Sequence, residues 1–141
     1  MGVRVRVKLR SLQTGREVTT AALLNAGYET EKPECILPVR LAEELEVWPK
    51  LPKGARVKSY DTAGGPVKMY CIEDSVEIIV VAGDESSKCT SNLVISEIER
   101  EVLLSDAAIE ALNIIIDSPL KGLWKFRDSS KLHGSEKPEY W

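Results

Sequence analysis

A short turn-like segment follows the most apolar run in the first part of the chain. The run from Val18 to Leu24 ends at Asn25, Ala26 and Gly27. Asparagine and glycine tolerate the tight, left-handed backbone that such a turn needs. The Asn25 amide can donate and accept hydrogen bonds, but it cannot gain or lose a proton near neutral pH. The Asn25 side chain therefore offers no general acid or base.

Acid–base chemistry would need carboxylates, and three lie near turns or loops. Asp61 begins the glycine-rich stretch Asp61-Thr62-Ala63-Gly64, which lies between two strand-like segments and is interpreted as a hairpin tip. Glu29 and Glu31 belong to a polar loop, where glutamates are usually solvated. An enzyme that uses these unconventional carboxylates stays open as an alternative.

Metal and cofactor chemistry has little support among the residue types. His133 is the only histidine, and Cys35, Cys71 and Cys89 are widely spaced without a CxxC pair. We expect no metal and no cofactor. The three cysteines fit reduced, structural thiols in a cytoplasmic protein.

Composition excludes several further classes. The net charge of −3 gives no electrostatic reason to expect nucleic acid as a partner. No apolar run reaches the roughly 18 residues of a membrane span, and the N-terminus lacks a signal-peptide pattern. A single glutamine among many charged residues is typical of a thermophile.

The hydrophobic pattern predicts a mainly β protein with two short helices. Helices are expected where Leu41, Leu45 and Trp48 share one face and where Ile109 and Leu112 do. The stretch 83–91 is interpreted as a polar loop, and Ser96-x-x-Glu99 as a capping box that starts one helical turn. Strands are expected at 3–10, 18–24, 35–37, 57–60, 67–72, 76–81, 93–95, 114–116 and 123–126.

A weak internal repeat suggests how these elements combine. The segment 37–47 parallels the segment 104–114, each an apolar strand that runs into a compact helix. The repeat predicts a pseudo-two-fold, closed β-barrel domain over 1–127, followed by a polar, flexible tail over 128–141. Tyr140 and Trp141 at its end either dock on a pocket or a partner, or are disordered.

Four segments in their order resemble the retropepsin-like aspartic protease family. They are Ala21-Ala22-Leu23-Leu24-Asn25-Ala26-Gly27, Ile36 to Leu45, Ser59 to Tyr70 and Val102 to Leu112. The family places its catalytic Asp-Thr/Ser-Gly turn, the following strand and helix, its flap hairpin and its late turn at these points. The resemblance implies a homodimer with a cleft, in which two carboxylates share a proton and activate water.

The chain departs from the family at the centre of that site. Asn25 stands at the catalytic aspartate, Ala26 at the Thr or Ser, and Ser105 at a usual glycine. The resemblance thus implies an inactive, archaeal homologue that binds an extended peptide or another ligand without hydrolysis. The ligand-binding residues it implies are Asn25, Gly27, Ala63, Gly64, Gly65 and Ser105.

Two further expectations concern partners. Trp124 and Phe126 alternate with basic residues, and because family dimers pair through terminal strands, these two are the candidate subunit contact; core packing is the alternative. Ile36 to Leu45, followed by Gly54 to Val57, also looks like swapped-hairpin DNA-binding regulators. The acidic total disfavours that alternative.

Overall fold

A computed structural model describes residues 2–141 and shows a mainly β protein with two short helices. The strands are β1 (Arg4–Ser11), β2 (Glu17–Leu24), β3 (Glu34–Pro38), β4 (Arg56–Thr62), β5 (Gly65–Ala82), β6 (Glu85–Ser96), β7 (Val102–Leu104), β8 (Ile114–Ser118), β9 (Leu123–Phe126) and β10 (His133–Gly134). The helices are α1 (Val39–Glu44) and α2 (Asp106–Ala111).

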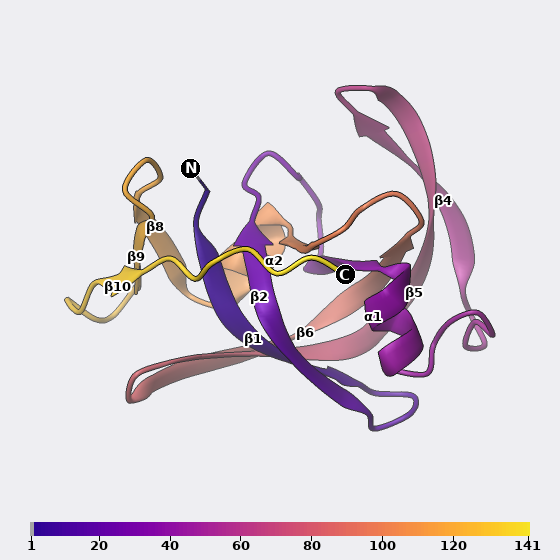
Figure 1. Ribbon diagram of the computed structural model, residues 1–141, viewed down its shortest axis with the longest axis horizontal. Coiled ribbons are helices and arrows are strands. Elements are labelled where there is room, and N and C mark those ends of the chain that lie inside the picture. Colours follow the sequence, from indigo (N-terminus) through magenta and orange to yellow (C-terminus); the bar gives the residue numbers. More distant parts are fainter. Residues whose placement is uncertain (1) are drawn as a thin grey trace.

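Six strands close into a barrel (Figure 1). Their order is β1-β2-β7-β3-β6-β5, and β5 returns to pair with β1 in antiparallel fashion. In β1 the apolar side chains Val5, Val7 and Leu9 alternate with charged ones and are fully buried. This period of two places every second residue inside the barrel, as the sequence predicts for this segment.

The β4–β5 hairpin extends beyond the barrel, because β5 is longer than its barrel partner β1. The second half of β5 pairs with β1, whereas its first half pairs with β4, and β4 ends the sheet order. A register shift between Ile72 and Val76 bends the strand there, and Asp74 has a positive φ of 46°. The two segments predicted at 67–72 and 76–81 are therefore one irregular strand.

Two predictions for the segment 83–99 are wrong. Residues 85–91 are not a loop but the first half of β6, which pairs with β5 after a tight turn at Gly83. Their polar side chains reflect a strand with solvent along one face. The Ser96 Oγ does accept the Glu99 N–H at 3.0 Å, but no helix follows, because β7 begins only three residues later.

Both helices are six residues long and end alike. Leu45 and Leu112 are the C-caps, and each is followed by a residue with positive φ, Glu46 at 58° and Asn113 at 57°. The first helix is shorter than expected, since Trp48 lies beyond it. The internal repeat stays a prediction.

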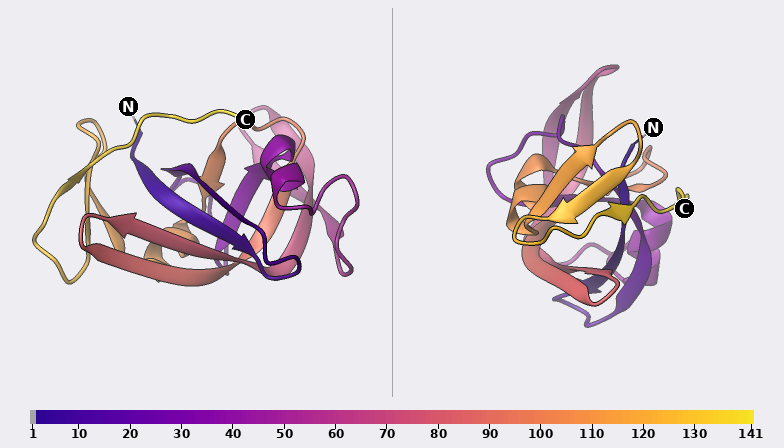
Figure 2. Two further views of the ribbon diagram at one scale, coloured as in Figure 1. Left: turned by 60° about the horizontal axis from the view of Figure 1, so that its bottom comes forward. Right: turned by 90° about the vertical axis from the view of Figure 1, so that its left-hand side faces the viewer.

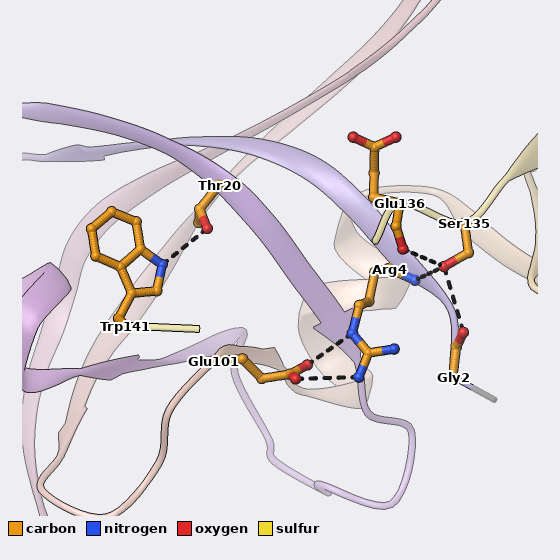
Figure 3. A network of polar contacts seen from close by, with 7 residues as sticks. All are labelled: Gly2, Arg4, Thr20, Glu101, Ser135, Glu136 and Trp141. Atoms are coloured by element: carbon orange, nitrogen blue, oxygen red, sulfur yellow. Dashed lines mark hydrogen bonds and ion pairs between the residues drawn. The ribbon is translucent and has the colours of Figure 1, made fainter. Parts of the chain in front are cut away.

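The C-terminal segment 135–141 lies against the barrel and connects it to the loop 97–101 (Figure 2). It follows a small sheet of β8, β9 and β10 and crosses β1 and β2. The Glu136 N–H donates to the Arg4 carbonyl at 2.9 Å, and the Trp141 N–H donates to the Arg100 carbonyl at 2.7 Å. Trp141 Nε1 also donates to Thr20 Oγ1 at 3.1 Å (Figure 3).

Arg4 and Glu101 form a two-pronged ion pair beneath this segment (Figure 3). Arg4 Nε and Nη2 donate to the two Glu101 carboxylate oxygens at 3.1 and 3.2 Å, and both side chains are largely buried. The pair joins β1 to the residue that precedes β7. Among residues 2–141, no helix is long and apolar enough to cross a membrane.

Removing one charge of this pair should destabilise the protein. We expect Glu101→Gln to lower the free energy of unfolding by about 2 kcal/mol, because Arg4 then keeps a largely buried charge without its counter-ion. The matched control is Glu17→Gln, which breaks the exposed pair between Lys8 and Glu17 and should cost less than about 0.5 kcal/mol. Urea unfolding of both variants measures the difference; equal losses would contradict the expectation.

Candidate functional site

Asn25 begins a compact turn immediately after β2. Its N–H donates to the Leu104 carbonyl at 3.0 Å, which ties the end of β2 to the end of the parallel strand β7. Its side-chain Oδ1 accepts the Gly27 N–H at 3.2 Å, and its carbonyl accepts the Tyr28 N–H at 3.0 Å. The amide oxygen thus shapes the turn, and the Nδ2 group is left without a partner in the described chain.

A cavity of about 310 Å³ lies between this turn and the β4–β5 hairpin. Its apolar lining includes Ile36, Met69 and Leu103, which belong to a small hydrophobic cluster separate from the barrel core. The other lining residues come from the turn after β2, the hairpin and the loop after β6. They are Asn25, Gly27, Tyr28, Tyr60, Asp61, Thr62, Ala63, Val67, Ser96, Ile98 and Glu99.

Three of the six residues predicted to bind a ligand meet at this cavity: Asn25, Gly27 and Ala63. Gly64 and Gly65 lie at the hairpin tip and do not line it. Gly65 has a φ of 107°, a conformation that other residues rarely adopt, so its role is to make the turn.

Ser105 has a structural position rather than a place in the cavity. Its side chain is fully buried, and its Oγ accepts the N–H groups of Ala108 at 3.2 Å and Glu34 at 3.0 Å. It therefore caps α2 and joins this helix to β3. A glycine could not make either bond, which explains why a hydroxyl residue suits this turn.

Asp61 is a hairpin residue, in agreement with its interpretation from the sequence. It pairs with Pro66 next to the tip, while its neighbour Tyr60 pairs with Val67. Asp61 is exposed and lines the cavity beside the paired residues Tyr60 and Val67. Glu29 and Glu31 do not line the cavity.

Sequence reasoning missed the loop 97–101 as part of the site. Ile98 and Glu99 line the cavity, and Ile98 is 66% exposed. Burial, and then the negative charge of Glu101, raise the pKa of Glu99. The sequence signal that could have indicated this loop was Ile98, an apolar residue between two glutamates in a stretch too short for a helix.

Trp124 and Phe126, the predicted subunit contact, are buried within the chain. Their rings meet edge to face at 5.1 Å, and both lie close to His133. With 2% and 7% of their surface exposed, these side chains have almost no area left for a second subunit. Trp124 and Phe126 therefore pack in the core of the chain, which was the alternative interpretation of their pattern.

A buried polar cluster stands behind the cavity. The Tyr28 hydroxyl donates to Glu34 Oε1 at 2.6 Å, and Asn92 Nδ2 donates to Glu34 Oε2 at 3.2 Å. The Tyr60 hydroxyl is also buried but has no hydrogen-bond partner within the described chain. Burial is the first cause that raises the pKa of Tyr28 and of Tyr60, and the neighbouring Glu34 adds to both shifts.

Comparison with models of protein families gives no match for this chain, and no curated protein matches it significantly. We therefore base the functional assignment on the cavity, on the buried polar cluster and on the residues around Asn25. No group of three or more histidine, cysteine, aspartate or glutamate side chains within residues 2–141 is placed to hold a metal ion.

The role assigned to Ser105 can be tested by stability. Ser105→Ala should lower the free energy of unfolding by about 2–3 kcal/mol, because it removes a helix cap and leaves the Glu34 N–H unpaired. Ser118→Ala is the control, since Ser118 accepts only an exposed hydrogen bond from Lys121, and it should change stability by less than about 0.5 kcal/mol. Thermal and urea unfolding would refute the assignment if Ser105→Ala were as mild as the control.

Proposed function

We propose that this chain is a retropepsin-like domain that forms a homodimer and binds an extended peptide beneath the β4–β5 hairpin without cleaving it. The observation that carries the proposal is the neutral Asn25 amide at a cavity with an apolar wall of Ile36, Met69 and Leu103, with no partner for its Nδ2 group among the described residues. An amide there can bind a peptide carbonyl but cannot act as the general base that hydrolysis requires.

The hairpin supports binding of an extended ligand. β4 pairs with β5 on one side and ends the sheet order, so the backbone groups on its outer edge have no strand partner. An extended peptide can pair with such an edge, and apolar side chains of the peptide can then enter the cavity. Ile36, Met69 and Leu103 offer them a hydrophobic surface.

The pairing of β2 with β7 supports the retropepsin-like assignment. These strands run parallel, and the Asn25 turn and the Ser105 turn follow their ends. The resemblance places the catalytic turn and the late turn of the family at the same two points.

The two alternative functions have weaker support. Asp61 lines the cavity as an exposed residue next to the hairpin tip, where a carboxylate is normally solvated rather than held for catalysis. In the segment similar to swapped-hairpin regulators, Leu37, Leu41 and Leu45 are fully buried in the barrel core. That segment has no free apolar face for a hairpin exchange.

Binding without hydrolysis is the first test. We expect the protein to bind fluorescent peptides rich in valine and leucine, and to produce no new peptide termini from them or from denatured casein between acidic and neutral pH. Asn25→Asp keeps an oxygen for the Gly27 N–H but loses the donor, so peptide affinity should fall by about tenfold. Fluorescence polarisation and mass spectrometry give the two readouts.

Peptide cleavage that survives repeated purification and disappears in Asp61→Asn would refute the non-catalytic proposal and favour the unconventional peptidase. Absence of peptide binding would refute the peptide ligand.

The homodimer has its own test at the edge of the cavity. An apolar opening of about 430 Å³ lies beside the cavity and shares Asn25 and Ile98 with it, and Leu23 and Tyr140 also line this opening. We propose that a second copy covers it, because burying an exposed isoleucine stabilises an interface. Ile98→Asp should raise the dissociation constant of the dimer by at least about tenfold.

Leu120→Asp is the matched control, because Leu120 is 77% exposed but lies in the β8–β9 turn outside this opening. Sedimentation analysis should find its dimerisation unchanged. A monomeric native protein would refute the dimer, and dissociation caused by Leu120→Asp alone would place the contact on the small sheet.

A further inference from the structure

The buried Glu34 carboxylate faces a second cavity without a counter-ion. Only 6% of the residue is exposed, and its hydrogen-bond partners, Tyr28 and Asn92, are both neutral. No basic group of residues 2–141 lies within ion-pair distance of it. A buried charge is costly unless a partner of opposite charge compensates it.

The second cavity has a volume of about 390 Å³ and adjoins the first one, because Tyr60 lines both. Its rim carries two acidic residues, Glu31 and Glu73, and two basic residues, Lys32 and Lys58. Glu73 is paired with Arg56, and neither Lys32 nor Lys58 forms an ion pair with Glu34. Among the described residues, the carboxylate of Glu34 is therefore the buried acidic group of this cavity that has no direct ion pair.

The Tyr60 hydroxyl is a second unsatisfied group at the same place. It is buried and has no hydrogen-bond partner among the described residues. Native structures rarely leave a buried hydroxyl unpaired, so an unpaired one requires an explanation. A ligand group that donates hydrogen bonds would satisfy both the Glu34 carboxylate and the Tyr60 oxygen.

We propose that this second cavity binds a positively charged ammonium group of the peptide ligand, with Glu34 as its counter-ion. This inference rests on the proposed function and names the class of ligand, a peptide with a basic side chain or a free terminal amine. The apolar part of the peptide occupies the first cavity, and Tyr60 stands between the two sites.

Glu34→Gln is a suitable variant because glutamine can satisfy the same neighbours. Its oxygen can accept from Asn92, and its amide nitrogen can donate to the Tyr28 hydroxyl, which both accepts and donates. The variant thus removes the charge and keeps both contacts, with the direction of the Tyr28 hydrogen bond reversed. If the carboxylate only stabilises the fold, the melting temperature of Glu34→Gln will be lower than that of the native protein. If the carboxylate binds a cationic ligand, the melting temperature of the ligand-free variant will be equal to that of the native protein or higher.

The experiment compares two heptapeptides that differ only at the centre, where one has lysine and the other has the uncharged norleucine. Native protein should bind the lysine peptide at least about tenfold more tightly, the gain expected for one charge-assisted hydrogen bond. Glu34→Gln should reduce this preference to less than about twofold, with norleucine binding unchanged. Glu31→Gln, which neutralises an exposed rim carboxylate of the same cavity, should keep the preference.

Each outcome decides between this inference and the function on which it rests. Equal binding of both peptides by the native protein, or a lysine preference that survives in Glu34→Gln, overturns the ammonium site and leaves peptide binding intact. If neither peptide binds, a titration with n-butylammonium followed by NMR tests the ammonium site separately from the peptide-binding function. If the native protein binds this probe and Glu34→Gln does not, the ammonium site is supported and the peptide function is refuted. If the native protein does not bind the probe, both proposals are refuted.

Discussion

Pairing of β5 with β1 is the constraint on which the rest of the structure depends. Without it the β1-β2-β7-β3-β6-β5 order would be an open sheet with two exposed edges and one unprotected apolar face. Closure buries the alternating valines and leucines of β1 together with the inner side chains of the other strands. It also fixes the direction in which the first half of β5 leaves the barrel, and so it places the β4–β5 hairpin opposite Asn25.

The segments around the cavity bury less apolar surface than the barrel strands do. Its walls include the turn after β2, the hairpin and the loop 97–101, and the first and last of these are tied to distant parts of the chain. That loop is held by the Arg4–Glu101 ion pair (Figure 3). It is also held by the Trp141 N–H, which donates to the Arg100 carbonyl. Stable elements thus position a site whose own segments bury little apolar surface, as is common where a ligand must enter.

The buried charge of Glu34 has a cost that the fold alone does not explain. A glutamine could contact the same neighbours without the desolvation penalty of a carboxylate, although its amide nitrogen would have to donate to one of them. Such a group in a cavity is a candidate for a functional role. The neutral Asn25 and the charged Glu34 therefore divide the proposed recognition between an apolar cavity that binds backbone and a polar cavity that binds charge.

The sequence by itself determined the strands and helices whose pattern is local. The alternation in β1, the proline before α1 and the glycines of the hairpin tip all act within a few residues, so their elements could be predicted. The failures, at residues 83–99, occurred where a polar composition concealed a strand and where a capping bond formed without a helix. Residues 85–91 became a strand because they pair with β5 across the turn at Gly83, and no helix formed after Ser96 because β7 begins at Val102.

Only the tertiary structure decided which side chains share a cavity. It brought Asn25, Gly27 and Ala63 together, gave Ser105 a structural role, and buried Trp124 and Phe126 inside the chain. It also revealed Glu34 as a buried carboxylate without a counter-ion, although the sequence shows it only as one glutamate among many. Burial and charge compensation depend on residues that folding brings together from distant parts of the chain, and no local pattern records them.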